Sequence, residues 1–174
     1  MEEETIAQHI EAWKQGDREA LLPVIDWITP QLHRFLTAKT GSPGIAEDLT
    51  QDTMERMVTN LSRFQSGTNF RAWIFTIGLN VFRDHWRRNT RETSLPCLPS
   101  SATDAFDSVE STHNHRQLWQ QVSRLSENER TIILLRHTGE LSFRDIASML
   151  GLPLGTVLST QHRALIKLSR NVRM

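Results

Sequence analysis

Cysteine and tyrosine are almost missing from this chain. Its 174 residues include one cysteine, Cys97, and no tyrosine. One cysteine forms no internal disulfide and supplies no cysteine-based zinc site, so an apolar core has to hold the fold together. We expect such a protein to work in a reducing cytoplasm.

Long apolar runs are missing too. No stretch approaches the roughly 18 residues of a membrane span, and the acidic start Met1–Glu4 does not resemble a signal peptide. Glycine and proline are sparse, at 8 and 6 copies, whereas leucine, isoleucine and arginine are plentiful. This composition favours an all-α protein, and the length allows one medium domain or two small ones.

The net charge is zero, which is unusual for a protein that binds nucleic acid. The charges are unevenly distributed, however: the net charge is −5 over residues 1–63, +4 over 64–91, −3 over 92–117 and +4 over 118–174. We expect the acidic segments to face a protein partner and the basic ones to face phosphates. Charge blocks of this size also arise in shuffled sequences, so this pattern alone does not decide the function.

Four stretches at the front of the chain carry apolar residues at helical spacing: 4–15, 18–39, 45–62 and 70–88. Pro30 lies inside the second stretch and is expected to kink or break that helix.

The stretch 70–88 combines aromatic rings with arginines. Single-stranded nucleic acid binds to such mixtures, because bases stack on the rings while guanidinium groups hold phosphates. Trp73, Ile77 and Val81 share one face of the predicted helix, and we expect these three to lie in the core. The stretch therefore predicts a strand-binding helix with one buried side.

Residues 91–112 are rich in Ser, Thr, Pro and Asp, which predicts a flexible linker between an N-terminal domain, 1–90, and a C-terminal domain, 113–174. His113 and His115 would lie on different sides of a helix, so we expect no metal site there.

The most informative segment is 142–168. Ser142 followed by Asp145 is a helix-capping pattern, and Gly151 can adopt the left-handed conformation that ends a helix. After the turn at Leu152 and Pro153, a second helix of about 16 residues is expected from its apolar spacing. Its core side should carry Val157, Ala164, Leu165 and Leu168. Two helices joined by a tight glycine-containing turn indicate a helix-turn-helix, whose second helix enters a DNA major groove.

A second capping pattern, Ser126 with Glu129, divides residues 115–137 into two helices that pack on this unit. The sequence thus predicts an all-α protein of two small helical domains joined by a flexible linker, the C-terminal one a helix-turn-helix.

Three segments together resemble one protein family. AEDLTQDTMERMVTNLSRF and FRAWIFTIGLNVFRDHWRR are similar to the first conserved domain of bacterial RNA polymerase sigma factors of the extracytoplasmic-function group. LSENERTIILLRHTGELSFRDIASMLGLPLGTVLSTQHRALIKL is similar to their second domain. The resemblance implies a non-enzymatic protein without a cofactor. It would bind core RNA polymerase, read the −10 and −35 promoter elements and promote DNA melting.

The resemblance also implies residue roles. Docking on the polymerase clamp would fall to Asp48, Gln51, Asp52 and Arg56. A flipped non-template base of the −10 element would be held by Phe64, Gln65, Ser66, Thr68, Asn69, Phe70 and Arg71. The DNA just upstream would meet Asn80, Arg83, Asp84 and Arg87. The −35 element would be read by Thr156, Ser159, Thr160, His162, Arg163 and Lys167. Flipping a base costs a few kcal/mol, which binding of the exposed strand has to offset. An anti-sigma protein, often membrane-bound in this family, is a further implied partner.

The recognition helix departs from the family pattern. Relatives usually have TVKSRLHRA where this chain has TVLSTQHRA, so Leu158 and Thr160 replace basic residues and Gln161 replaces an apolar one that should face the core. Each lost phosphate contact lowers the salt slope by about 0.9. We expect weaker and less salt-sensitive −35 binding, which lysine at 158 and arginine at 160 should restore. Alternatively, the altered residues read a different base sequence, with Arg163 on a phosphate or a guanine.

Other functions remain open at this point. A DNA-binding regulator with a sensor domain is disfavoured, because a sensor domain would not require the segment AEDLTQD together with an aromatic and arginine-rich helix. An enzyme is disfavoured, because the sequence shows no nucleophile and base pairing, no phosphate loop and no metal-spaced histidines. A degenerate sigma factor that only competes for polymerase would fit the altered recognition helix. Cys97 is either a redox-sensitive thiol or a passive linker residue.

Overall fold

The computed structural model describes residues 1–65, 67–92, 121, 122 and 124–172. Cys97, His113, His115 and nearly all of the expected linker lie outside the described residues. The described elements are helices: α1 (Glu3–Lys14), the 3-10 helix η1 (Arg18–Leu21), α2 (Leu22–Thr40), α3 (Pro43–Asn60), the 3-10 helix η2 (Leu61–Arg63), α4 (Phe70–Glu92), α6 (Glu127–His137), α7 (Phe143–Leu150) and α8 (Leu154–Val172). This confirms the all-α prediction. None of these helices is long and apolar enough to cross a membrane.

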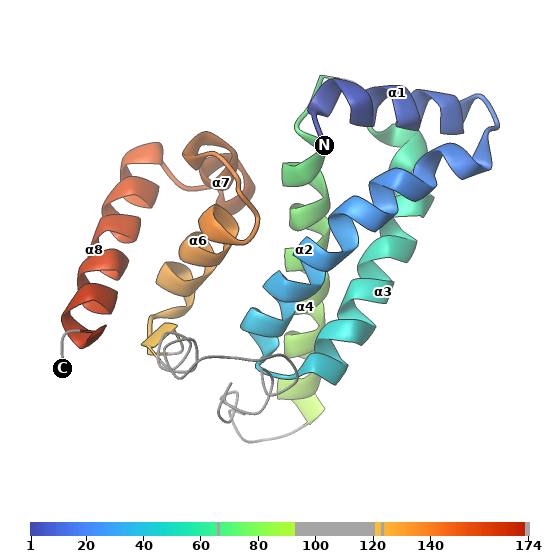
Figure 1. The fold of residues 1–174 in the computed structure, drawn as a ribbon. Coiled ribbons are helices and arrows are strands. Elements are labelled where there is room, and N and C mark those ends of the chain that lie inside the picture. The colour runs from blue at the N-terminus through green and yellow to red at the C-terminus, as the bar shows by residue number, and fades with distance from the viewer. Residues whose placement is uncertain (66, 93–120, 123, 173–174) are drawn as a thin grey trace.

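The front half, α1 to α4, is a bundle in which α2, α3 and α4 lie side by side while α1 crosses one end (Figure 1). Gly41 ends α2 in a left-handed conformation, with φ of 68°, and Ser42 begins α3 by accepting the Ile45 amide at 3.4 Å. This tight turn reverses the chain, so that α3 packs back against α2.

Helix α2 continues through Pro30, so the alternative that Pro30 breaks the helix is wrong. Ile28 and Leu32 on either side of the proline are fully buried. Burial of these two side chains in the bundle stabilises the helical backbone more than the missing proline hydrogen bond weakens it.

The rear half, α6 to α8, confirms both capping predictions. Ser126 and Glu129 form a reciprocal capping box at the start of α6, and Ser142 accepts the Asp145 amide at 3.1 Å at the start of α7. Gly151 ends α7 in the left-handed conformation, with φ of 63° and ψ of 32°. The local sequence therefore fixes the ends of the helix-turn-helix.

The core side of α8 is turned slightly from the predicted one. Val157 and Ala164 are fully buried, as predicted, and Leu168 packs against the small cluster that contains Ala164. Leu165 is 42% exposed, so its core assignment was wrong, and Thr160 is buried instead. Positions 157, 160 and 164 keep the 3- and 4-residue spacing of an α-helix, whereas neighbours 164 and 165 cannot both face the same core.

The two halves pack against each other. One continuous cluster of buried side chains includes Phe35 and Phe75 of the front half and Ile132, Leu135 and Ile146 of the rear half. At the same interface the buried Lys39 ammonium donates to the Glu127 carboxylate and, at 2.8 Å, to the Thr131 hydroxyl. Burial lowers the pKa of Lys39 below its ordinary value of 10.5, although Glu127 opposes this shift.

Replacing Lys39 with methionine is expected to raise the free energy of unfolding at pH 7 by about 1–2 kcal/mol, because methionine avoids desolvating a buried ammonium. The pKa of Lys39 is lower in the folded than in the unfolded chain. Wild-type stability therefore rises with pH between the lowered value and 10.5. Urea unfolding at pH 7 and pH 10 should show a smaller advantage of the variant at pH 10.

The exposed Arg18 provides the control, since Arg18→Met should leave stability nearly unchanged. A Lys39→Met variant that is less stable than the wild type at pH 7 would show instead that the interaction with Glu127 outweighs desolvation.

Candidate nucleic-acid interface

The outer face of α3 carries a connected set of charges. Asp48 and Gln51 are exposed, and Asp52 and Arg56 are half-buried. Arg56 donates to Asp52 at 2.9 and 3.2 Å and pairs with Asp84 of α4 at 3.5 Å. Asp52 and Asp84 together raise the pKa of Arg56. The residues expected to dock on polymerase thus share one face, and Arg56 links that face to α4.

The loop before α4 holds fewer exposed rings than expected. Phe64 and Phe70 are 5% and 0% exposed and meet edge to face, with ring centroids 5.5 Å apart. Trp73 packs on Phe64 at 5.1 Å. The predicted contact of the Phe64 and Phe70 rings with DNA is therefore corrected: both fill the core where α1, η2 and α4 meet.

The polar residues of this loop are brought together at the start of α4. Gln65 and Thr68 are exposed, and Ser66 lies outside the described residues. Asn69 caps α4, since its side-chain oxygen accepts the Ala72 amide at 3.0 Å, while its amide nitrogen donates to Asp145 of α7 at 3.1 Å. The loop and the first turn of α4 therefore touch the rear half.

Arg71 also reaches the rear half. Its guanidinium lies 4.8 Å from the ring of Trp27 and pairs with Glu140 at 2.5 Å. Arg71 holds the pKa of the Glu140 carboxyl below its usual range.

A Glu3 carboxylate oxygen accepts the Phe70 amide at 3.1 Å, which the sequence analysis did not foresee. Acidic side chains are known to stabilise helix N-termini, but Glu3 and Phe70 are 67 positions apart, so the sequence did not reveal that Glu3 reaches the start of α4.

Three exposed residues continue along one face of α4. Asn80, Arg83 and Arg87 follow the helical spacing of 3 and 4 residues, and all are exposed. Arg87 pairs with the half-buried Asp84 at 3.0 Å. Arg83 and Arg87 also line a cleft of about 680 Å³ whose opposite wall is α6. The predicted upstream contacts therefore form one surface strip.

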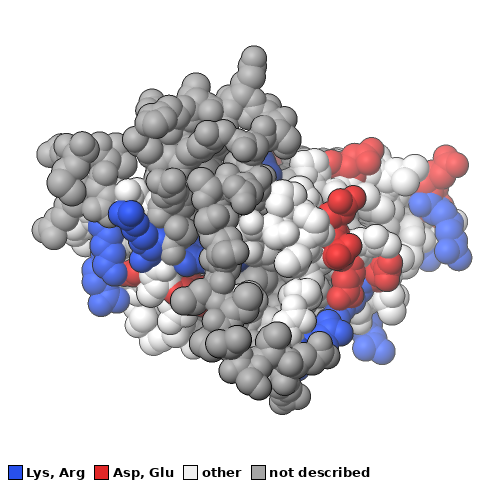
Figure 2. Space-filling view, turned by 90° about the horizontal axis from the view of Figure 1, so that it is seen from below, with Lys and Arg blue, Asp and Glu red and all other residues white. Residues whose placement is uncertain are grey.

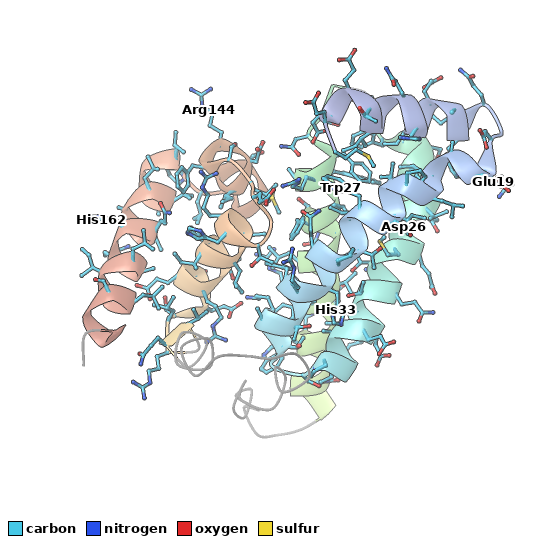
Figure 3. The ribbon with its side chains drawn as sticks, in the orientation of Figure 1. Glu19, Asp26, Trp27, His33, Arg144 and His162 are labelled. Carbon is cyan, nitrogen blue, oxygen red and sulfur yellow. The ribbon has the colours of Figure 1, made fainter. Side chains whose placement is uncertain are left out.

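On α8 the structure separates the predicted reading residues. Thr156, Ser159, His162 and Arg163 are exposed, and His162 points away from α6 and α7 (Figure 3). Thr160 is only 7% exposed, and its hydroxyl accepts Arg163 at 3.1 Å, so the structure does not bring Thr160 to the outer face.

Lys167 differs from these residues because it is engaged within the domain. It pairs with the two oxygens of the buried Glu129 at 2.7 and 2.9 Å and lowers the pKa of that carboxyl.

Gln161 is half-buried, in partial agreement with its predicted core orientation. Arg144 of α7, which the sequence analysis did not select, is exposed and points outward (Figure 3). Because the first helix of a helix-turn-helix crosses the DNA backbone, a phosphate contact by Arg144 could have been predicted from the sequence.

Charged side chains of both signs lie on the face shown in Figure 2. A group of Lys and Arg stands at the end where the rear half lies, and the side of the front half carries acidic side chains together with further Lys and Arg. Within the described residues, no three His, Cys, Asp or Glu side chains gather as a metal site would require.

Comparisons with known proteins agree with this geometry. Residues 28–92 match sigma-70 region 2, and residues 115–168 match sigma-70 region 4. The chain is 30% identical over 141 residues to the ECF RNA polymerase sigma factor EcfG of Rhodopseudomonas palustris, covering 80% of this chain and 78% of that protein. It is 30% identical over 159 residues to the ECF sigma factor RpoE of Cereibacter sphaeroides, covering 90% and 88%.

Solved structures show the same fold. The sigma factor RpoE of Bartonella quintana, in complex with the anti-sigma factor NepR, superposes with a TM-score of 0.78 at 24% identity, covering 90% of this chain and 98% of that one. CnrH, in complex with the cytosolic domain of CnrY, gives 0.73 at 22% identity, with 97% of both chains covered. The order of the two matched regions and the helix-turn-helix together show that this chain belongs to the ECF group of sigma-70 family factors, non-catalytic subunits that bind core RNA polymerase and direct its recognition of promoters.

Proposed function

We propose that this sigma factor divides promoter recognition between its halves, with the front half on the −10 element and the rear half on the −35 element. Helix α3 docks on polymerase through Asp48, Gln51, Asp52 and Arg56. The observation that carries this proposal is the Arg56–Asp84 pair, because it ties the polymerase face of α3 to α4, the helix of the DNA-facing strip.

The −10 strand contacts are the exposed or half-buried polar groups of the loop and of α4. Asn69 and Arg71 stand at the start of α4, and Asn80, Arg83 and Arg87 extend along it. Guanidinium groups suit phosphates, and asparagine amides suit base edges. Melting is favoured when these groups bind the separated strand more strongly than they bind the duplex.

In the rear half, we assign the −35 reading surface to Thr156, Ser159, His162 and Arg163, with Arg144 as an added phosphate contact. Lys167 contributes to stability through Glu129 and is exposed enough to contact DNA as well. An anti-sigma protein, either soluble or anchored in the membrane, would cover the exposed apolar residues of both halves, such as Ile45, Val58 and Leu165, and the sigma factor itself would work in the cytoplasm.

The test is in vitro transcription with purified core polymerase and a library of genomic promoters. A defined set of start sites with shared −10 and −35 sequences supports the proposal. Tight polymerase binding without any transcript would indicate a competitor of other sigma factors. No binding to core polymerase would end the proposal.

Replacing Leu158 with lysine should tighten −35 binding about threefold to tenfold and make the salt slope steeper by about 0.9, because Leu158 is 42% exposed on the outer face of α8. Fluorescence polarisation with a −35 duplex over a range of salt concentrations measures both quantities. Similar affinity and slope in the variant would favour the alternative that the helix reads another base sequence.

Thr160→Arg should not tighten binding, contrary to the expectation from sequence. Thr160 is buried, so an arginine there should lower the free energy of unfolding by about 1–3 kcal/mol. Thermal unfolding of the variant distinguishes this loss of stability from an effect on DNA.

A further inference from the structure

We propose that the cleft between α4 and α6 binds a small organic anion with an aromatic body, such as an aryl carboxylate. Apolar side chains inside the cleft would cover the rings, and guanidinium groups at its edge would hold the carboxylate. The inference goes beyond promoter recognition, because it gives the chain a small-molecule ligand.

The first observation is the size and place of the cleft. It has a volume of about 680 Å³, with α4 on one side and the start of α6 on the other. Sites for small molecules usually measure roughly 300–1,000 Å³ and often lie between domains. The cleft is therefore large enough for a ligand of two fused rings.

The second observation is the apolar character of the inner walls. Leu79, Phe82 and Leu125 line the cleft and are 3%, 8% and 4% exposed. The ring of Phe82 stacks on that of Trp86, at 21° between planes and 6.2 Å between centroids. Further flat rings pack well against such a pair. A rigid aromatic body also loses less conformational freedom on binding than a flexible chain would.

The third observation is the charge around these walls. Among the described residues that line the cleft, four are cationic, Lys39, Arg83, Arg87 and Arg130, and one is acidic, Glu127. Glu127 is already paired with Lys39. Burial lowers the pKa of Lys39 most, and the positive charges of Arg130 and Arg83 lower it further. The cations therefore lie close enough to repel one another, and an anion between them would be attracted.

Arg83 is the cation best placed to hold that anion. It is exposed, and within the part of the chain that the structure describes it has no hydrogen bond or ion pair. Arg87, by contrast, pairs with Asp84 at 3.0 Å. A guanidinium group fits a carboxylate through two parallel hydrogen bonds. Since Arg83 lies three positions before Trp86 on the same side of α4, one ligand can contact both.

A ligand in the cleft would also affect DNA binding. Arg83 and Arg87 are proposed contacts of the DNA upstream of the −10 element, so a bound anion would compete with DNA for them. This consequence rests on the proposed function, whereas binding of the ligand to the free chain does not.

The experiment titrates the isotope-labelled full chain with 2-naphthoate and follows the backbone amides by NMR. Saturable shifts in segments 79–87 and 125–131 are expected, with a Kd of roughly 0.1–1 mM for a ligand of this size. The matched ligand is 2-naphthylmethylammonium, which has the same rings and the opposite charge. It should bind at least about tenfold more weakly, because it repels the cations of the cleft.

Three variants test the assigned contacts. Arg83→Gln should weaken binding of 2-naphthoate about fivefold to tenfold. Arg88→Gln is the control, because Arg88 is an exposed cation of α4 that does not line the cleft. Asn128→Trp places a large side chain at an exposed position of the opposite wall, so it should abolish binding while the circular dichroism spectrum stays unchanged.

Binding in the cleft that prefers the anion, weakens in Arg83→Gln and persists in Arg88→Gln supports the proposal. Equal affinity for the two naphthalene ligands, equal effects of Arg83→Gln and Arg88→Gln, or undiminished binding in a folded Asn128→Trp overturns it. Shifts outside the cleft, or no saturable shifts up to about 10 mM, overturn it as well. Binding to core polymerase, measured in parallel, tests the proposed function separately, because a sigma factor without this ligand site could still bind polymerase and start transcripts.

Discussion

Replacing Phe75 with alanine is expected to lower the free energy of unfolding by about 3–5 kcal/mol. Phe75 is fully buried, meets Phe35 edge to face at 5.2 Å between ring centroids, and lies against the glycine turn of the rear half. Its loss leaves a cavity within the cluster of buried side chains that the two halves share. Since domains of this size are stable by about 5–15 kcal/mol, the effect is a large part of the total.

Urea unfolding followed by circular dichroism measures this change. Ile166→Ala, on the exposed face of α8, should change stability by less than about 0.5 kcal/mol. If the halves unfold together, Phe75→Ala shifts a single transition. A shift confined to one of two transitions would show that the rear half is stable alone, and a loss below about 1 kcal/mol would contradict the assigned packing.

Replacing Asp48 with lysine is expected to weaken binding to core polymerase about 30- to 100-fold, or about 2–3 kcal/mol. Asp48 is exposed in the middle of the outer face of α3, beside Asp52. A cation there would reverse whatever attraction the Asp48 carboxylate contributes to the proposed docking of α3 on polymerase. The fold should be unaffected, because no described hydrogen bond or ion pair involves the Asp48 side chain and exposed substitutions change stability little.

Fluorescence polarisation of labelled sigma factor against purified core polymerase measures the affinity, and transcription from a responsive promoter should fall in parallel. Glu19→Lys is the matched control, since the exposed Glu19 lies in η1 before α2, whereas Asp48 lies in α3, after the turn at the other end of α2. Wild-type affinity of Asp48→Lys would place the polymerase contact elsewhere on the front half.

Local signals predicted the helices and their ends well. Ser126, Ser142 and Gly151 act at short range through their own side chains or backbone, so three or four neighbouring residues suffice to recognise them. The same holds for the apolar spacing that placed Val81 and Val157 in the core.

The direction of a side chain was harder to predict where the residue type suits both a DNA-binding surface and the core. An aromatic ring beside arginine suits both a base-stacking platform and a core, and burial of Phe64 and Phe70 depends on α1 covering them from a distant part of the chain. Thr160 was assigned to the DNA-reading surface because its side chain is polar. Its position, one helical turn from the buried Val157 and Ala164, instead indicates the core side of α8.

Contacts between the halves could not be predicted from one sequence. The Lys39–Glu127 pair spans 88 positions and the Arg71–Glu140 pair spans 69. Neither pair follows a spacing rule, since only the packing of two separately formed units brings them together. The flexible linker predicted between the two domains gave no indication of which residues would meet across the interface.

Gly78 explains why α4 sits so near its neighbours: a Cβ there would lie 2.8 Å from Leu32 of α2 and 3.6 Å from Thr53 of α3. Together with Arg56–Asp84, this contact prevents α4 from sliding along α3. On the proposed roles of the two helices, a displacement of α3 by the polymerase would carry the −10 contacts of α4 with it. The distance between the polymerase contacts and the −10 contacts would then be set by the front half alone, whatever the length of the segment that joins the two halves.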